Sequence, residues 1–215
     1  MTDTTISIRI DKSLHEKMKR IESVYREVLY NAMEKKEFQL TQSELSKKLA
    51  ISLSIVNLAI RKLNSIGAVK IEQRSFSVLD PKKILYLWAS LRNLDKDTIF
   101  KARIELPIRE IERQMPDVFF SAYSAYKLRF QDVPADYSEV YVYADEKELE
   151  EIKKRVSKLK TSKTNTNPNF FVLKKDSSMK LYKQIPLAQI FVDLWNIKEW
   201  YAKDFITALQ NKIGE

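Results

Sequence analysis

The sequence predicts an α+β protein of two domains, residues 1–95 and residues 96–215. In the first domain, helical periodicities lead into one pair of short strand patterns. In the second domain, strand and helix patterns alternate, which predicts a mixed α/β arrangement. The composition can supply both cores, because 44% of the 215 residues are apolar and 11% are aromatic.

Rare residue types exclude several classes of protein. The chain has no cysteine, which excludes disulfide scaffolds, thiolate zinc sites and cysteine nucleophiles. Two glycines are too few for a glycine-rich phosphate loop, and the single histidine, His15, leaves no histidine pair to hold a metal. We therefore expect no metal site and no cofactor.

The chain shows no membrane or secretion signal. No apolar run approaches the roughly 18 residues of a membrane span. The first residues lack the basic and apolar segments of a secretory signal. We expect a cytoplasmic protein with no membrane partner.

The first 40 residues predict a strand followed by a long helix. Residues 5–10 alternate polar and apolar side chains, which is a strand signal. From about Ser13 to Glu37, apolar residues recur at intervals of three or four, which predicts a helix. Residues 38–40 form a short connection.

Two shorter helices follow. Thr41–Glu44 reads as a capping box and opens a helix that ends near Ala50. Ser52 is a suitable N-cap for a second helix over residues 53–65. Gly67 lies just beyond this helix, where a left-handed residue is needed. The apolar face of the second helix consists of Val56, Ala59, Ile60 and Leu63.

A hairpin and another helix complete this domain. Residues 68–72 and 76–79 read as strands joined by a turn at 73–75. Asp80 and Pro81 then start a helix that runs through Leu91. Three helices, a tight corner and a two-stranded hairpin make the winged helix-turn-helix arrangement.

This arrangement predicts a DNA-binding surface. A helix fits the major groove, where asparagine pairs with adenine and arginine with guanine. Hydroxyls and amides at helix starts suit phosphate groups. The net charge of +9 favours contact with a polyanion. The predicted DNA contacts are Thr41, Gln42, Ser52, Ser54, Asn57, Arg61, Lys62 and, at the hairpin tip, Arg74.

Four stretches of this domain are LSKKL (45–49), SLSIV (52–56), IRKL (60–63) and GAV (67–69). Through them, about residues 24–80 resemble the winged helix-turn-helix regulators of archaea and bacteria. The resemblance implies a transcription regulator that binds double-stranded DNA. We expect it to be a homodimer whose second domain senses a ligand, dimerises or binds a partner.

A second DNA-binding arrangement starts from residues 5–10. Thr5, Ser7 and Arg9 alternate with three isoleucines ahead of an amphipathic helix. This resembles the start of a ribbon-helix-helix repressor, and it would add these three polar residues to the DNA contacts. It competes with the winged arrangement, which needs residues 22–36 for its first helix. A plain edge or dimer-pairing strand is the other interpretation.

In the second domain, strand and helix patterns occur in mixed order. The predicted strands are 98–106, 118–120, 140–143 and 170–174. The predicted helices are 107–114, 121–130, 146–160, 186–195 and 198–212. Residues 161–169 form a loop by composition.

Two segments, FFSAYSAYKL (119–128) and VPADYSEVYVY (133–143), resemble the AbiEi-type antitoxin regulators, as does a later block at 186–205. Those regulators join a winged helix to a nucleotidyltransferase-like domain. The resemblance implies a repressor of its own operon and an antitoxin of a toxin–antitoxin system. It also implies a nucleotidyltransferase-type toxin as a protein partner.

The sequence lacks the residues that nucleotidyl transfer requires. Such enzymes use a glycine turn and then two carboxylates at i and i+2 of a strand to hold Mg²⁺. Here the turn position holds Ala122 and Tyr123, and the carboxylate pair falls on Asp136 and Ser138. Glu139 is one step off, which sends its side chain to the other face. We therefore expect no catalytic residue and a protein that is not an enzyme.

Two other functions fit the sequence. One is a minimal nucleotidyltransferase that uses Asp136 with other acids. The other is a protein-interaction module whose wing docks a partner and binds no DNA.

Two further patterns have structural interpretations. Acids near two tryptophans are taken as helix-end and solvent-facing charges: Asp193, Glu199 and Asp204. Alternating tyrosines are taken as one buried and one half-exposed sheet face: Tyr137, Tyr141 and Tyr143.

Overall fold

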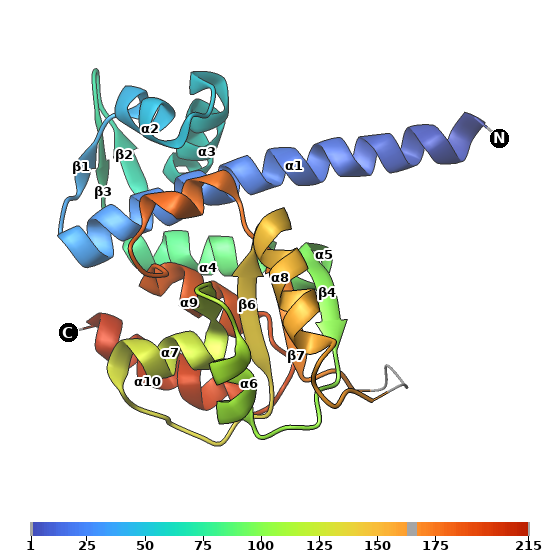
Figure 1. Cartoon of the computed structure of the whole chain (residues 1–215). Coiled ribbons are helices and arrows are strands. Elements are labelled where there is room, and N and C mark those ends of the chain that lie inside the picture. The colour runs from blue at the N-terminus through green and yellow to red at the C-terminus, as the bar shows by residue number, and fades with distance from the viewer. Residues whose placement is uncertain (1, 163–166, 215) are drawn as a thin grey trace. The chain divides into compact units, whose positions relative to one another are not determined.

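The computed structural model describes the backbone of residues 2–162 and 167–214, with side chains over 16–162 and 167–213. Its fold class is α+β, as the sequence predicts (Figure 1). The chain divides into two compact units, Met1–Ser90 and Leu91–Glu215. Across the described backbone, no helix combines the length and apolar character that crossing a membrane requires.

The first unit contains four α-helices, one π-helical turn and a small sheet among its described residues. The helices are α1 (Thr2–Tyr30), α2 (Gln42–Leu49), α3 (Leu53–Ser65) and α4 (Pro81–Leu91), and η1 (Asn31–Lys35) continues α1. The strands are β1 (Gln39–Leu40), β2 (Val69–Ile71) and β3 (Phe76–Val78). They form an antiparallel sheet in the order β1-β3-β2. The pair β2 and β3 is the predicted hairpin, and β1 adds a third strand.

The strand predicted over residues 5–10 is wrong, because α1 runs through it without a break. Ile6, Ile10, Leu14 and Met18 recur every four residues, so the same isoleucines also satisfy a helical period. A strand would moreover need a neighbouring strand to pair with. Without it, the ribbon-helix-helix arrangement loses its basis. The side chains of Thr5, Ser7 and Arg9 lie outside the described residues.

Helix α3 packs against α1 and α2 through the apolar face predicted from its sequence. Val56, Ala59, Ile60 and Leu63 are all buried. At an area-based value of about 25 cal/mol per Å², each large aliphatic side chain buried here contributes roughly 1.5–3 kcal/mol. The opposite face of α3 is thereby fixed outward on a rigid support.

The corners around α2 and α3 are closed by specific hydrogen bonds. The Thr41 hydroxyl accepts from the Glu44 amide at 3.1 Å, as predicted, and donates to the Glu44 carboxylate at 2.8 Å. After α2, Ala50 adopts a left-handed conformation (φ 52°), and the Ser46 hydroxyl donates to the Ile51 carbonyl at 2.7 Å. In the predicted capping box, the Glu44 carboxylate would accept from the Thr41 backbone amide. In the structure it accepts from the Thr41 hydroxyl instead.

The second unit is built on a four-stranded mixed sheet in the order β4-β7-β6-β5. Its strands are β4 (Thr98–Ala102), β5 (Phe119–Ser121), β6 (Val140–Ala144) and β7 (Phe170–Lys174). Its helices are α5 (Leu94–Asp97), α6 (Ile108–Gln114), α7 (Ala122–Phe130), α8 (Glu146–Val156), η2 (Ser177–Leu181), α9 (Leu187–Trp195) and α10 (Ala202–Gly214). Strands β6 and β7 are parallel, the other pairs are antiparallel, and a register shift lies between Thr98 and Phe100 of β4.

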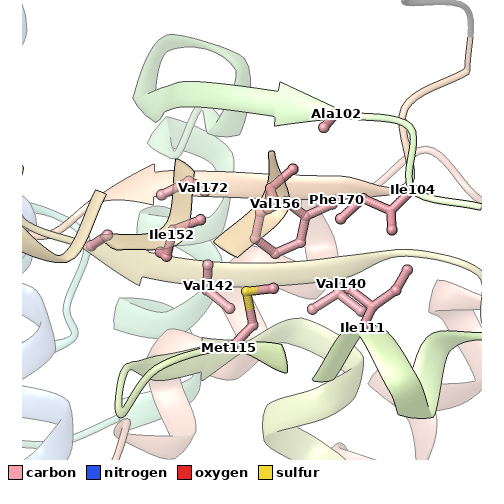
Figure 2. Packing of buried hydrophobic residues seen from close by; sticks show 11 residues of the cluster. Ala102, Ile104, Ile111, Met115, Val140, Val142, Ile152, Val156, Phe170 and Val172 are labelled. Carbon is pink, nitrogen blue, oxygen red and sulfur yellow. The ribbon is translucent and has the colours of Figure 1, made fainter. Parts of the chain in front are cut away.

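One face of this sheet carries an aliphatic core (Figure 2). Residues of β6 and β7 contribute alternate side chains, and α6 and α8 supply the covering residues. The labelled members are Ala102, Ile104, Ile111, Met115, Val140, Val142, Ile152, Val156, Phe170 and Val172. The alternation follows from the two-residue period of a strand.

The other face of the sheet is also covered, which corrects the half-exposed face predicted from the tyrosines. All five residues of β6 are buried, including Tyr141 and Tyr143. Helices α7 and α9 pack on this face beside β5 and β6. A strand paired in parallel inside a sheet is usually covered on both sides. Tyr137 precedes the strand and lies half-buried in the connection from α7.

A buried polar network lies within the second unit, and it corrects the solvent-facing assignment of Asp193. The Arg92 guanidinium donates to Asp193 at 2.9 Å, to the Tyr143 hydroxyl at 2.8 Å and to Asp97. Asp193 also accepts from Ser121 and Tyr143, both at 2.6 Å, and from Gln189 at 3.0 Å. Asp193 is 0% exposed. A buried carboxylate persists only with such partners, and its arginine lies far away in the sequence.

Candidate nucleic-acid interface

The outward face of α3 carries a short strip of exposed side chains. Ser54, Leu58, Arg61 and Ser65 succeed one another at intervals of four, three and four residues, and all four are exposed. Such spacing places them along one line of a helix surface. This strip is opposite the buried residues that dock α3 on α1 and α2.

The amides at the start of α3 have no side-chain cap. Ser52 occupies the N-cap position, as predicted, but its hydroxyl lies 3.0 Å from the Ser54 hydroxyl and caps no amide. The first turn therefore combines two exposed hydroxyls with uncapped backbone donors. Helix starts of this kind favour phosphate oxygens, through the amides and the helix dipole.

Two of the predicted contact residues, Gln42 and Asn57, are joined across the corner between α2 and α3. The Asn57 side-chain nitrogen donates to the Gln42 side-chain oxygen at 3.0 Å. An asparagine amide has two donor hydrogens and one acceptor oxygen. One hydrogen is used by Gln42, so the second hydrogen and the oxygen remain for another group. These are the two functions that an adenine edge requires.

Leu58 is the feature that the sequence interpretation missed. Its side chain is 44% exposed, and it lies between Ser54 and Arg61 on an otherwise polar strip. The available signal was its spacing, four residues after Ser54 and three before Arg61. An apolar side chain at such a place matches the methyl group of thymine, which is an apolar feature of the major groove.

Three predicted cations are free to meet phosphates. Arg61, Lys62 and Arg74 are exposed, and none of their side chains forms a hydrogen bond or ion pair with any residue that the structure describes. Lys62 lies beside Arg61 near the end of α3, and Arg74 lies in the turn of the hairpin. Unpaired surface cations of this kind supply the salt-dependent part of DNA binding.

The hairpin keeps its own carboxylate occupied. Glu72 accepts from the hydroxyls of Ser75 at 2.9 Å and Ser77 at 3.0 Å, and from the Gln39 amide at 3.4 Å. Hydrogen bonds from Ser75 and then Ser77 lower the pKa of Glu72 below its usual range. The exposed carboxylate is thus occupied by neighbouring side chains, and Arg74 forms no ion pair with it.

In Figure 1, α2, α3 and the β2–β3 hairpin lie on the same side of α1. The half-buried Thr41 and Gln42 stand at the start of α2, and Ser52 and Ser54 at the start of α3. Seven predicted contacts therefore belong to two packed helices, while Arg74 belongs to the hairpin.

Comparisons with known proteins identify no relative. No protein family, no curated protein and no solved structure matches this chain.

The structure also places the residues of the predicted, incomplete nucleotidyl-transfer site in the second unit. Asp136 is exposed in the connection between α7 and β6, not on a strand. Glu139 immediately precedes β6, where it accepts from the Tyr201 hydroxyl at 2.5 Å. Tyr141 follows Glu139 by two residues, so in a strand the two side chains would lie on the same face. Ala122 at the turn position has a left-handed backbone (φ 49°).

No cluster of acids in this part replaces the missing carboxylate. Among the residues that the structure describes, no group of three or more histidine, aspartate or glutamate side chains is arranged to hold a metal ion. Both carboxylate oxygens of the buried Asp193 already accept hydrogen bonds, from Arg92, Ser121, Tyr143 and Gln189. Its geometry is that of an internal ion pair.

Proposed function

We propose that this chain is a DNA-binding transcriptional regulator, acting as a repressor, whose first unit is a winged helix-turn-helix. The observation that carries the proposal is the outward strip of α3. The strip carries Leu58 and Arg61, and the half-buried Asn57 lies beside Leu58 in the sequence, on a helix whose opposite face is buried in the core. These three side chains match base edges. Unpaired cations flank the strip.

In this proposal, α3 lies in the major groove. Asn57 contacts an adenine and Arg61 a guanine, and Ser54 contacts either kind of base edge. Thr41, Gln42, Ser52 and Lys62 lie where a neighbouring phosphate backbone would pass. The β2–β3 hairpin is the wing, and Arg74 reaches the minor groove or a phosphate. A homodimer would place two such helices on half-sites about one helical turn apart.

We further propose that the second unit does not catalyse nucleotidyl transfer. Support comes from Tyr141, which stands where a second metal-binding carboxylate would follow Glu139. Further support comes from Asp136, which lies off the sheet. The unit would instead sense a ligand, dimerise or bind a partner, in keeping with repression of its own operon and an antitoxin role. Incubation with labelled nucleotides and Mg²⁺ tests this. Label transfer that Asp136→Ala abolishes would refute it.

The DNA-binding proposal is tested with a duplex selected from a randomised library by the full-length protein. Arg61→Ala should reduce the preference for the selected duplex over a scrambled one by roughly 5-fold to 150-fold, because one bidentate base contact is worth about 1–3 kcal/mol. Arg74→Ala should weaken binding to both duplexes alike and reduce the slope of log affinity against log salt by about one.

The matched control is Arg113→Ala, which removes the same charge from an exposed position on α6 in the other unit. It should leave both affinities unchanged. The recognition role of α3 would be refuted if the double variant Asn57→Ala, Arg61→Ala bound the selected duplex as tightly and as selectively as the wild type. A chain that selects no duplex at low salt would be a protein-interaction module instead.

A further inference from the structure

A cavity of about 360 Å³ opens in the second unit beside the middle of the sheet. Its wall includes Tyr141 of β6 and Phe171 of β7, and its rim includes Asp95, Lys198 and Glu199. A volume of this size is in the range of small-molecule sites. None of these residues takes part in the proposed DNA contacts.

The wall of the cavity includes a stacked aromatic pair. Tyr141 and Phe171 are register partners on the parallel strands β6 and β7. Their rings face each other, with centroids 4.7 Å apart and an interplanar angle of 8°. Because the strands fix the two backbones, the pair forms a rigid apolar block against which an apolar group can pack.

The hydroxyl of Tyr141 lacks a partner. The residue as a whole is 8% exposed, and its hydroxyl, which is accessible to solvent, makes no hydrogen bond with any described residue. Tyr143, two residues along β6, bonds Arg92, Asp193 and Gln189. The unpartnered hydroxyl of Tyr141 therefore belongs to the wall of a cavity, where an incoming group can satisfy it.

The rim of the cavity is acidic in a chain whose net charge is +9. Lys198 lies 3.9 Å from Asp95, so these two opposite charges largely offset each other. The Glu199 carboxylate makes no ion pair or hydrogen bond with the described residues. Burial is the main cause that raises the pKa of the Tyr141 hydroxyl. The negative charges of Glu139, Glu199 and Asp95 raise it further. The negative potential at this hydroxyl favours a cation.

We propose that this cavity binds a small organic cation, an amine carried on a planar apolar group. The planar group lies against Tyr141 and Phe171. The ammonium donates to the Glu199 carboxylate and to the Tyr141 hydroxyl oxygen. A free small molecule suits the cavity volume of about 360 Å³, and Tyr141 in its wall is buried while Phe171 is half-buried. The proposal holds whether or not the first unit binds DNA.

The test is isothermal titration calorimetry of the full-length protein with two probes that share one ring system. Tryptamine carries an amine and indole-3-propionate carries a carboxylate. Tryptamine should bind saturably with one site per chain, and indole-3-propionate should bind at least tenfold more weakly. Equal affinity for the two probes, or no saturable binding of tryptamine, would overturn the proposal.

Two variants and a control locate the site. Glu199→Gln should weaken tryptamine binding at least tenfold, and Tyr141→Phe should weaken it several-fold while keeping the aromatic wall. Glu146→Gln, at an exposed position on α8, removes the same charge elsewhere and should change nothing. If Tyr141→Phe does not fold, Glu199→Gln decides alone, since this glutamate is exposed. Unchanged affinity in Glu199→Gln would refute the assignment.

Discussion

Asn57 donates a hydrogen bond to Gln42 across the corner between α2 and α3, with 3.0 Å between the two side-chain atoms. The bond fixes the rotation of the asparagine amide relative to the exposed strip of α3. If Asn57 reads a base as proposed, it must be held in one orientation, and Gln42 would supply that restraint from a neighbouring helix as a positioning residue.

The first prediction concerns this pair. Asn57→Ala should reduce discrimination at one base pair by about tenfold or more, because an asparagine–adenine contact is worth roughly 1–3 kcal/mol. Gln42→Ala should reduce discrimination at the same base pair, and the double variant should add little. Fluorescence anisotropy over single-base operator variants measures this. Strictly additive losses would show that the two residues act independently.

The second prediction concerns Leu58 and thymine. Replacing one thymine of the selected duplex by uracil removes only its methyl group. At one position, this replacement should weaken binding by the wild type several-fold, since about 0.8 kcal/mol accompanies each buried methyl-sized group. Leu58→Ala should bind the thymine and uracil duplexes equally. Leu79→Ala is the control, because Leu79 is also exposed but lies after the hairpin. A thymine–uracil difference that survives in Leu58→Ala would contradict the assignment.

The third prediction concerns the buried ion pair of Arg92 and Asp193. Asp193→Asn removes one of the two buried carboxylates that pair with Arg92 and leaves Asp97 as the other, so it should destabilise the second unit by about 3 kcal/mol, the lower end of the range for breaking a buried pair. Asp204→Asn changes an exposed aspartate on the next helix and should cost less than about 0.5 kcal/mol. Urea unfolding followed by circular dichroism compares the two. Similar midpoints for both variants would mean that the pair contributes little.

The fourth prediction uses two left-handed residues with opposite expected signs. Ala50 is exposed with φ 52°, so Ala50→Gly relieves a conformation that costs alanine roughly 1 kcal/mol and should stabilise the first unit. Gly67 has φ 68°, and a methyl group there would meet only an ordinary contact with Lys83 at 3.6 Å. Gly67→Ala should therefore destabilise by a similar amount through strain alone. Thermal unfolding measures both, and shifts of the same sign would refute this reasoning.

The fifth prediction concerns alkaline pH. Burial raises the pKa of seven tyrosines above the ordinary value of 10.0, including Tyr126 and Tyr201 to about 12. The others are Tyr25, Tyr123, Tyr137, Tyr141 and Tyr143. Because folding favours the neutral phenol, this contribution to stability is complete below pH 10 and is lost as the pH rises towards 12 and beyond.

Absorbance at 295 nm follows this titration. The folded protein should show only a small part of the tyrosine signal near pH 10, and the rest should appear together with unfolding. In guanidinium chloride, all tyrosines should ionise near pH 10. A folded protein whose full tyrosine signal developed at pH 10 would contradict the assigned burial.

Local sequence patterns predicted much of the fold. The bounds of α3 and β7 follow from apolar spacing within a few residues, and Gly67 ends its helix region as expected. The α+β class is confirmed, while the winged arrangement and its DNA contacts stay predictions. The strand over residues 5–10 failed because an alternating run of six residues also satisfies a four-residue period.

Contacts between residues that are distant in the sequence could not be predicted from local sequence patterns. Asp193 looks like a surface charge until Arg92, 101 positions earlier, is brought beside it. The exposure of Leu58 and the bond between Gln42 and Asn57 likewise depend on how α3 is rotated on its neighbours. For the same reason, the cavity beside Tyr141 could not be foreseen, since its wall joins two strands that pair only in the folded chain.

The order of the second sheet has a consequence for self-association. Its two outer strands each leave one row of backbone groups unpaired, and such a row is a template for fibril growth. Strand β5 has only three residues, while β4 carries a register shift and an exposed Lys101. A shortened edge and a kinked, charged edge both interrupt the straight pairing that stacking would require. Both border strands are therefore poor templates for the addition of a further strand.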